Sequence, residues 1–338
     1  MEYAFLLWPH ANTRYVASLR KLAHQELHCM LKSCGIPAEI SWIDLGGAPW
    51  LHVSCTSLPT SALHLISGHS SIYMGATLEN GLLRPLDYKT PDYLPPDMAE
   101  VLKYKGKTNA AFTGLMLNCA LCASAFVQSK EPLFIMDPMC GKATSLFCAL
   151  TRGHNAIGVE MDGKDVQEAG SFISRYLQLH RIKHKISQGS LTLPGGKSAP
   201  YTAWQLADTN EHYQAGDTRS LKLIQGDTTH CSAMLKKQSI HLMIADLPYG
   251  VQHAPRQDQR MDGFQSLLRK ALPGWHQILM PGGAIALSFN TYTLKKADLA
   301  NELQKAGFHV LTESPFDDFD HWVEQAVQRD LLVAVKQS

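Results

Sequence analysis

Short, β-rich apolar runs follow one another from residue 133 to the end of the chain, with helical or loop stretches between them. They cover residues 133–137, 156–162, 221–227, 240–246, 284–289, 309–313 and 331–335. Continuous apolar strands that alternate with helices are typical of a parallel sheet covered by helices on both faces. The pattern therefore predicts an α/β domain with a parallel sheet in the second half of the chain.

The first 95 residues follow another order. We expect a strand at residues 2–8, a helix to about residue 33, strands at 40–45 and 50–54 joined through Gly46 and Gly47, and a short helix at 60–67. This order predicts a small α+β module. Residues 85–96 are rich in proline and turn formers, so we place the linker there and divide the chain into domains 1–95 and 96–338.

Two further segments of the larger domain have distinct compositions. Residues 110–126 are apolar nearly all round, which predicts a helix buried on most sides. Residues 185–220 are polar and contain glycine and proline, which predicts a surface loop.

Charge and cysteine content exclude several classes of protein. Lys and Arg total 31 against 30 Asp and Glu, so an anionic partner must be met by a local patch. The eight cysteines are scattered, and the amino terminus has no signal peptide or anchor pattern. We therefore expect a cytoplasmic protein with reduced thiols and no membrane partner. Cys119 and Cys122 lie in an apolar helix and the histidines lack zinc spacing, so no metal is expected.

A turn with the sequence DPMCGKAT, residues 137–144, directly follows the run at 133–137 and precedes a helical segment. At the carboxyl edge of a parallel sheet, backbone N–H groups and a helix dipole converge on such a turn, which favours a nucleotide-like ligand. Gly141 permits close approach of the backbone. A plain strand-to-helix turn is the alternative.

Two more acids end successive strands. Glu160 is about 20 residues beyond the first turn and suits a bidentate hydrogen bond to ribose hydroxyls. Asp227 ends the third strand and can accept a hydrogen bond from the exocyclic amine of adenine, although either acid can also cap a helix. Together with Asp137, these acids predict a pocket for an adenosine-containing cofactor.

The sharpest motif is DLPYG, residues 246–250, which directly follows a buried strand. Methyl transfer to an exocyclic amine needs an acceptor for the amine hydrogens, a flat wall for the base and a rigid turn. Asp246 can accept the hydrogens, with the carbonyl of Leu247 or Pro248, while Pro248 fixes the turn and Tyr249 stacks on the base. A proline turn beside a buried aromatic side chain is the alternative.

With DPMCG, GVEMD, QGD and DLPYG in this order, the chain from about residue 100 resembles the class I S-adenosylmethionine-dependent methyltransferases of the THUMP-associated tRNA guanine-N2 group. The resemblance implies a seven-stranded Rossmann-like domain, S-adenosylmethionine as methyl donor and a guanosine amine in tRNA as acceptor. The first 95 residues resemble the ferredoxin-like module alone, as in bacterial relatives without a THUMP domain.

The resemblance also implies roles for individual residues. Asp137, Cys140, Gly141 and Thr144 would line the methionine side of the cofactor, Glu160 the ribose, Asp227 the adenine and residues 246–249 the target base. Thr108 and Asn109 fall where relatives place polar residues near the methionine carboxylate. Lys142 and Ala143 depart from the family pattern, because many relatives have a small residue and a second glycine there.

Two basic clusters are candidates for RNA binding. One contains Arg175, Arg181, Lys183 and Lys185, which we expect on the helix after Glu160. The other is the segment KYKGKTN, with Lys103 and Lys105 as candidate phosphate ligands. A merely solvated basic face is the alternative for both clusters.

The main functional hypothesis is methylation of the guanosine N2 amine in tRNA. The same chemistry on adenine N6 in DNA or RNA, or on a protein glutamine, is a second hypothesis. A catalytically silent subunit that binds RNA or a partner protein is a third, and an activating subunit or a homodimer stays open.

Overall fold

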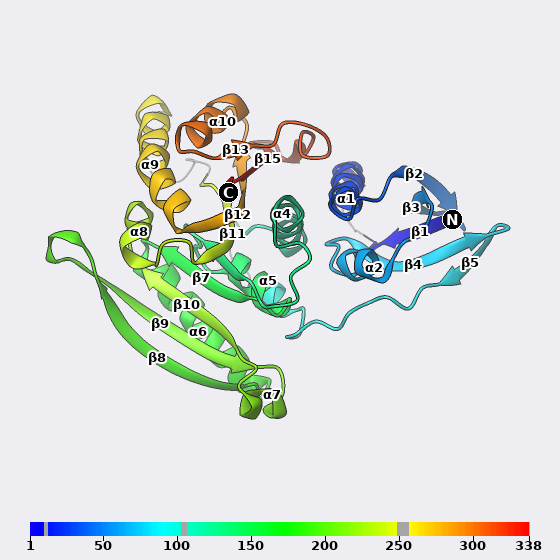
Figure 1. The fold of residues 1–338 in the computed structure, drawn as a ribbon. Helices are drawn as coiled ribbons and strands as arrows, with labels where there is room; N and C mark the ends of the chain where they lie inside the picture. The colour runs from blue at the N-terminus through cyan, green and yellow to red at the C-terminus, as the bar shows by residue number, and fades with distance from the viewer. Residues whose placement is uncertain (10–12, 103–106, 249–256, 338) are drawn as a thin grey trace.

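The computed structural model describes residues 1–9, 13–102, 107–248 and 257–337, and the side chains of 13–17 and 257–262 are also outside the description. Two separate sheets organise these residues: a smaller one in the amino-terminal module and a larger one that carries the rest of the chain (Figure 1). Within this part of the chain, no helix combines the length and apolar character needed to cross a membrane.

The amino-terminal module has the predicted α+β character. Its elements are β1 (Glu2–Leu7), α1 (Thr13–Ser33), β2 (Ala38–Leu45), β3 (Ala48–Cys55), α2 (Thr60–Ser67), β4 (Ile72–Glu79) and β5 (Leu82–Pro85). The sheet is antiparallel with the order β2-β3-β1-β4-β5. The β-α-β-β-α-β succession is the ferredoxin-like arrangement, and β5 extends it at one edge.

The larger sheet contains every strand predicted after residue 133. These strands are β6 (Phe134–Asp137), β7 (Asn155–Glu160), β10 (Arg219–Gln225), β11 (Ile240–Asp246), β12 (Leu279–Asn290), β13 (His309–Val310) and β15 (Val327–Val335). The sheet order is β13-β15-β12-β11-β6-β7-β10-β9-β8, and β14 (His321–Glu324) pairs with β15. The strands β6, β7, β10, β11 and β12 are mutually parallel, whereas β9 and β15 are antiparallel to their neighbours β10 and β12. The sheet is therefore Rossmann-like but mixed rather than wholly parallel.

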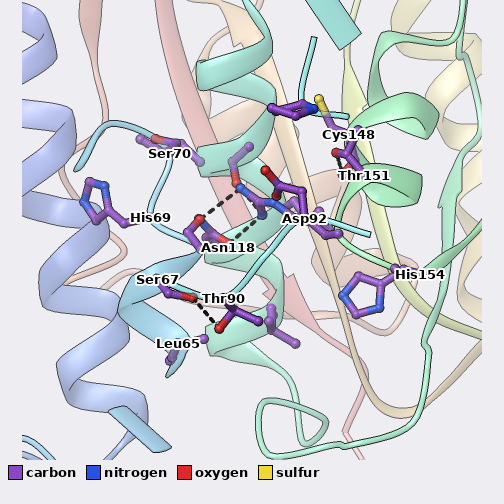
Figure 2. A pocket seen from close by; sticks show the side chains of 18 of the residues that line it. Leu65, Ser67, His69, Ser70, Thr90, Asp92, Asn118, Cys148, Thr151 and His154 are labelled. Carbon is purple, nitrogen blue, oxygen red and sulfur yellow. Dashed lines mark hydrogen bonds between the residues drawn. The ribbon is translucent and has the colours of Figure 1, made fainter. Parts of the chain in front are cut away.

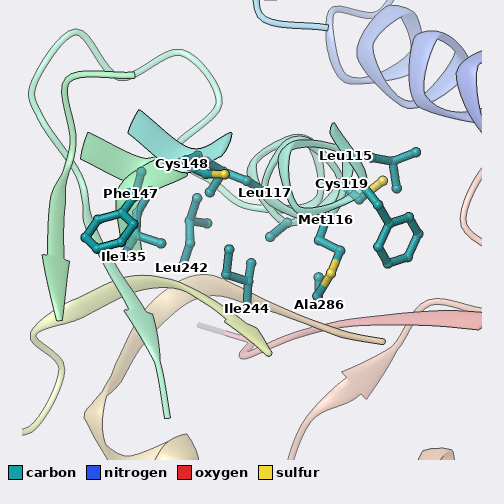
Figure 3. Packing of buried hydrophobic residues seen from close by; sticks show 14 of the residues in the cluster. Leu115, Met116, Leu117, Cys119, Ile135, Phe147, Cys148, Leu242, Ile244 and Ala286 are labelled. Carbon is teal, nitrogen blue, oxygen red and sulfur yellow. The ribbon is translucent and has the colours of Figure 1, made fainter. Parts of the chain in front are cut away.

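Helices cover both faces of the larger sheet. They are α3 (Met98–Val101), α4 (Ala110–Ala123), α5 (Thr144–Thr151), α6 (Gly163–Leu179), α7 (Asn210–Ala215), α8 (Cys231–Met234), α9 (Gln257–Ile278) and α10 (Lys296–Lys305), with short 3₁₀ turns η1 (Pro194–Gly196) and η2 (Thr228–His230). Apolar residues of α4, α5 and α6 join one buried cluster, and those of α8, α9 and α10 join another. The predicted burial of α4 is confirmed, and Figure 3 shows its Met116 and Leu117 on the side of the helix that faces β11 residues Leu242 and Ile244.

The expectation of a surface loop at residues 185–220 is wrong. The segment forms the antiparallel hairpin of β8 (Lys183–Thr192) and β9 (Ser198–Ala207), followed by α7, and β9 pairs with β10. The hairpin turn uses Gly195 and Gly196, both with φ of 75°. Trp204 and Leu206, which alternate with less buried residues along β9, are buried and hold the hairpin on the sheet. β8 is polar and mostly exposed, so the segment as a whole has the composition of a loop.

No helix or strand lies between β5 and α3, at residues 86–97, where we expect the linker. The division of the chain at residues 95 and 96 stays a prediction. The amino-terminal module is in contact with the larger domain, because α1 and α4 pack against each other and their buried side chains belong to one cluster.

Candidate functional site

Four carboxylates predicted from the sequence lie at the carboxyl ends of four neighbouring strands. Asp246 ends β11, Asp137 ends β6, Glu160 ends β7 and Asp227 follows β10, and these strands are adjacent in the order β11-β6-β7-β10. Along the chain, β7 and β10 are added on one side of β6, and β11 and β12 are then added on its other side, so β6 and β11 flank a topological switch point. Parallel α/β sheets bind ligands outside the carboxyl ends of the strands at such a point. We call this group the acidic edge.

Asp137 is the most buried member of the acidic edge, at 5% exposure. Its carboxylate accepts hydrogen bonds from the Ser145 hydroxyl and from the Met139 backbone N–H, the latter at 2.9 Å. Burial raises the pKa of Asp137 to about 7, and the nearby carboxylates of Glu160 and Asp246 act in the same direction, while the two hydrogen bonds oppose the shift. The group is therefore poised to change charge near neutral pH.

The turn after Asp137 is folded tightly against β7. Cys140 donates its backbone N–H to the Val159 carbonyl at 3.0 Å, and its side chain is buried. A Cβ on Gly158 would lie 2.6 Å from the Cys140 sulfur, so only glycine allows this approach. Burial raises the pKa of the Cys140 thiol well above its usual range, which makes it a packing residue and a poor nucleophile.

The two departures from the family pattern have structural outcomes. Ala143 adopts a φ of 70°, a left-handed conformation that glycine adopts more easily, directly before Thr144 begins α5. Lys142 forms an ion pair with Glu168 of α6. Gly141 has a φ of 49°, and a Cβ built there would meet no heavy atom within 4 Å, so the space above it is open.

Glu160 contacts the turn from the neighbouring strand. Its Oε2 accepts from the Gly141 N–H and its Oε1 from the Asp162 N–H, both at 2.9 Å. A carboxylate can accept about four hydrogen bonds, so two backbone donors fix its orientation and leave acceptor capacity.

Asp227 caps the short turn η2. Its Oδ1 accepts from the backbone N–H of Thr229 at 2.9 Å and from the Thr229 hydroxyl at 2.8 Å. Burial raises the pKa of Asp227, but these hydrogen bonds together with His230 and Lys197 outweigh it, and the net pKa is lowered. The side chain is therefore an ionised acceptor across the neutral pH range.

Asp246 is held by side chains from three other segments. Its Oδ1 accepts from the Ser288 hydroxyl of β12 at 2.8 Å, and its Oδ2 accepts from the Thr108 hydroxyl and lies 3.3 Å from Nη2 of Arg329 on β15. The Arg329 guanidinium also lies 4.9 Å from the ring centroid of Phe112 in α4. Thr108 was predicted from the sequence near the cofactor, whereas Ser288 and Arg329 were not.

The remaining predicted residues of this region have mixed outcomes. Asn109 caps α4 by accepting from the Ala111 N–H at 2.8 Å. Pro248 is exposed, and the preceding Leu247 is buried with its N–H donated to the Ser288 carbonyl at 2.8 Å. Tyr249, Lys103 and Lys105 lie outside the described residues.

The basic cluster expected on one helix is divided between elements, which corrects that expectation. Arg175 is on α6, Arg181 lies in the turn after it with a φ of 55°, and Lys183 and Lys185 are on β8. The helix ends at Leu179 with His180 as its cap, so it cannot carry the later residues.

A large open cavity of about 1590 Å³ lies apart from the acidic edge. Its lining includes residues of α1, α2, β4, α4 and α5, the segments 89–97 and 126–133, and Arg219 at the start of β10, and it includes none of the four carboxylates (Figure 2). His69, Asn118 and His154 are among the lining side chains. The acidic edge is the stronger candidate site, because Leu133, His154 and Arg219 of the cavity lie at the amino ends of β6, β7 and β10, whereas parallel sheets bind ligands at the carboxyl ends of their strands.

Cys119 and Cys122 are both buried, and burial raises the pKa of each thiol well above its usual range. The expectation of packing residues fits these surroundings. Within the described ranges, no three or more His, Cys, Asp or Glu side chains are arranged to hold a metal ion.

No family model matches this chain, and no curated protein matches it. Several solved structures are similar in fold. TrmN from Thermus thermophilus is 16% identical over 88% of this chain and 60% of its own, with a TM-score of 0.40. A TehB-like SAM-dependent methyltransferase from Corynebacterium glutamicum is 13% identical over 62% of this chain and 84% of its own, with a TM-score of 0.35.

A third similar structure is the 1,6-didemethyltoxoflavin-N1-methyltransferase of Burkholderia thailandensis, which holds S-adenosylhomocysteine. It is 12% identical over 63% of this chain and 75% of its own, with a TM-score of 0.36. Likenesses at these identities and TM-scores establish neither a ligand nor an activity for this chain.

Proposed function

We propose that this chain is an S-adenosylmethionine-dependent methyltransferase that methylates the exocyclic N2 amine of a guanosine in tRNA. The observation that carries the proposal is the acidic edge, with its four carboxylates at the ends of neighbouring strands. The DLPYG motif, residues 246–250, begins at Asp246, which ends β11, the strand next to the one that ends at Asp137.

The acidic edge fits an adenosine-containing cofactor. Ribose hydroxyls and an adenine amine are hydrogen-bond donors, and Glu160 and Asp227 are acceptors already oriented by backbone N–H groups. The open space above Gly141 leaves room for a ligand at the start of α5. In this proposal Asp137, Cys140, Gly141 and Thr144 line the methionine side, with Thr108 and Asn109 nearby.

When bound, the cofactor supplies an electrophilic methyl group on a cationic sulfur. Transfer would join the methyl carbon to the amine nitrogen, leave the electron pair of the C–S bond on sulfur and release one proton from the nitrogen to water. Asp246 orients the amine by accepting its hydrogen bond and balances the positive charge that develops on nitrogen. Ser288, Thr108 and Arg329 hold that carboxylate in place.

The choice of a guanosine in tRNA depends on the resemblance carried by DLPYG. An amine on a base must leave the stack before it can reach a carboxylate at a sheet edge. We expect an unpaired or flipped-out guanosine, with Pro248 and Tyr249 against its ring.

The test is incubation of the full chain with methyl-labelled S-adenosylmethionine and unmodified tRNA, followed by nucleoside mass spectrometry. We expect label in N2-methylguanosine and a loss of at least about a hundredfold in rate for Asp246→Asn, because the substitution removes the charge that faces the developing cation. Asp87→Asn, at an exposed linker carboxylate, is the matched control and should keep full activity.

Other outcomes of this experiment would change the proposed methyl acceptor or the proposed activity. Label in methyladenosine, or in a protein glutamine when RNA is replaced by protein acceptors, would overturn the guanosine assignment and keep the cofactor. No transfer to any acceptor would favour a silent subunit.

A further inference from the structure

The β8–β9 hairpin extends the larger sheet beyond β10, as Figure 1 shows. One face of this extension is covered by α6, because Trp204 of β9 donates its ring N–H to the Ser174 hydroxyl of α6 at 3.1 Å. Ile186 pairs directly with Trp204, so the even-numbered side chains of β8 share that covered face. The odd-numbered side chains of β8 point to the other face.

Strand register identifies what the other face carries. Lys185 pairs with Gln205, and Ser187 pairs with Ala203, which in turn pairs with Lys222 of β10. Cross-strand partners lie on the same side of a sheet, so Lys183, Lys185, Gln205, Tyr201 and Lys222 share one surface. We call these five residues the lysine face.

Burial shows that the lysine face is open. Lys183, Lys185 and Gln205 are exposed, and Lys222 and Tyr201 are half-buried. The Lys222 ammonium lies 4.0 Å from the centroid of the Tyr201 ring. Toward the acidic edge the same side of the sheet becomes covered, since Ile224 is buried in one cluster with Met234 of α8.

The sequence of the hairpin carries charge of one sign. Residues 183–207 contain Lys183, Lys185 and Lys197 and no Asp or Glu, in a chain whose formal net charge is only +1. The next acid in the chain is Asp208, which pairs with His212 of α7 at 2.7 Å. A local cation-rich surface of this kind attracts polyanions without any global charge excess.

We propose that the lysine face binds the sugar-phosphate backbone of the RNA substrate. This inference rests on the proposed function, because it takes the acceptor at the acidic edge to be part of an RNA. Lysines neutralise phosphates without reading sequence, and an exposed face with a tyrosine beside them is typical of nucleic-acid surfaces.

Strand geometry sets the size of this partner. β8 runs parallel to β10, so its last residue, Thr192, lies toward the acidic edge and its first, Lys183, lies at the opposite end of the sheet. At about 3.3 Å per residue, the strand separates the two by roughly 30 Å. A molecule that contacts both Lys183 and the acidic edge must span about that distance, which a folded RNA does and a nucleoside or short peptide does not.

The test measures binding of fluorescent unmodified tRNA to the full chain by anisotropy at several KCl concentrations. The variant is Lys183→Gln with Lys185→Gln. The matched control is Lys236→Gln with Lys237→Gln, two adjacent exposed lysines before β11, five strands away in the sheet order. Both double variants remove the same charge.

We expect the Lys183/Lys185 variant to bind tRNA about tenfold more weakly at 0.1 M salt, with a slope of log affinity against log salt that is smaller by about one to two. The control should bind as the unchanged chain does. Addition of Lys222→Gln should weaken binding further. Calorimetric titration with S-adenosylhomocysteine should give equal affinities for all variants, because the lysine face lies away from the acidic edge.

Equal tRNA affinity and salt slope in the two double variants would overturn the proposal, whatever the methyl transfer activity. Equal competition by a DNA duplex or by phosphatidylserine vesicles would overturn the assignment to RNA. If S-adenosylhomocysteine does not bind while the lysine variants still lose tRNA affinity, the proposed methyl transfer fails and the RNA surface stands.

Discussion

Within the acidic edge, Asp137 is the carboxyl group whose pKa is raised by its surroundings to a value near neutral pH. Burial raises its pKa to about 7, far above the value near 4 expected in the unfolded chain. Below pH 4 the Asp137 carboxyl is protonated in both the folded and the unfolded chain, so its ionisation does not change the free energy of unfolding there. As pH rises from 4 to 7 the unfolded chain releases this proton while the folded chain keeps it, so the contribution of Asp137 to stability falls and then levels off above pH 7.

Asp137→Asn should therefore gain stability relative to the unchanged chain as pH rises. We expect the difference in free energy of unfolding to move in favour of the variant by roughly 2–3 kcal/mol between pH 5 and pH 8. Urea unfolding at the two pH values measures it. Asp87→Asn should show no such shift, and a flat difference for Asp137→Asn would contradict the raised pKa.

Arg329 and Asp246 form an ion pair that joins β15 to the start of the DLPYG turn. The side chains are 8% and 21% exposed. Removal of one partner from a poorly solvated pair takes a favourable opposite charge away from the other. Arg329→Met should lower the free energy of unfolding by about 1–3 kcal/mol, and Arg329→Lys should recover part of the loss.

A double-mutant cycle checks this pairing. If the ion pair operates, Arg329→Met should cost at least about 1 kcal/mol less in an Asp246→Asn background than in the unchanged chain. Arg84→Met, at an exposed arginine of β5, provides the control for loss of a surface arginine. Additive losses would show that Arg329 acts through packing on Phe112 instead.

At the scale of elements, apolar runs predicted α4 and seven strands of the larger sheet, because most of these elements are buried on both sides; the strands are β6, β7, β10, β11, β12, β13 and β15. β8 was missed because its residues are polar and mostly exposed, so its sequence has the composition of a loop. β8 is a strand because it pairs with β9. The strands β4 and β5 of the small sheet, which pair with β1 and with each other, were not predicted either. Such pairings are tertiary and leave little signal in a single segment.

The same reason explains which site residues could be predicted. Each acid of the acidic edge ends an apolar run, which is a local pattern. Ser288 lies opposite Asp246 only through the register of β11 with β12, and Arg329 is placed by the antiparallel pairing of β12 with β15. Residues 42 and 83 positions away from Asp246 in the chain have no local pattern that marks them.

At the scale of the whole molecule, a buried polar network joins the two parts of the chain. Glu26 of α1 is fully buried and accepts from the backbone N–H of Ser70 and from the side-chain amide of Asn118 in α4. The Asn118 carbonyl oxygen accepts from Arg152 at 2.6 Å, and Arg152 also donates to the Gly68 carbonyl at 3.1 Å (Figure 2). The network therefore fixes the small module against the helix that begins next to Thr108.

Loss of Asn118 should loosen this junction. Asn118→Ala deprives the buried Glu26 carboxylate of a donor and the half-buried Arg152 guanidinium of an acceptor, which we expect to lower the free energy of unfolding by about 3 kcal/mol. Differential scanning calorimetry measures the change. Asn301→Ala, the same substitution at an exposed position of α10, should change stability by less than about 0.5 kcal/mol. Equal effects of the two substitutions would contradict the role of the network.

The central claim is that the acidic edge binds an adenosine-containing methyl donor. Calorimetric titration of the full chain with S-adenosylhomocysteine tests it most directly, with Glu160→Gln, Asp227→Asn and the control Asp87→Asn measured in parallel. We predict binding to the unchanged chain and the control, and affinity at least about tenfold weaker in each edge variant, because each loses a charged acceptor. Absence of binding, or equal affinity in all four proteins, would contradict the account.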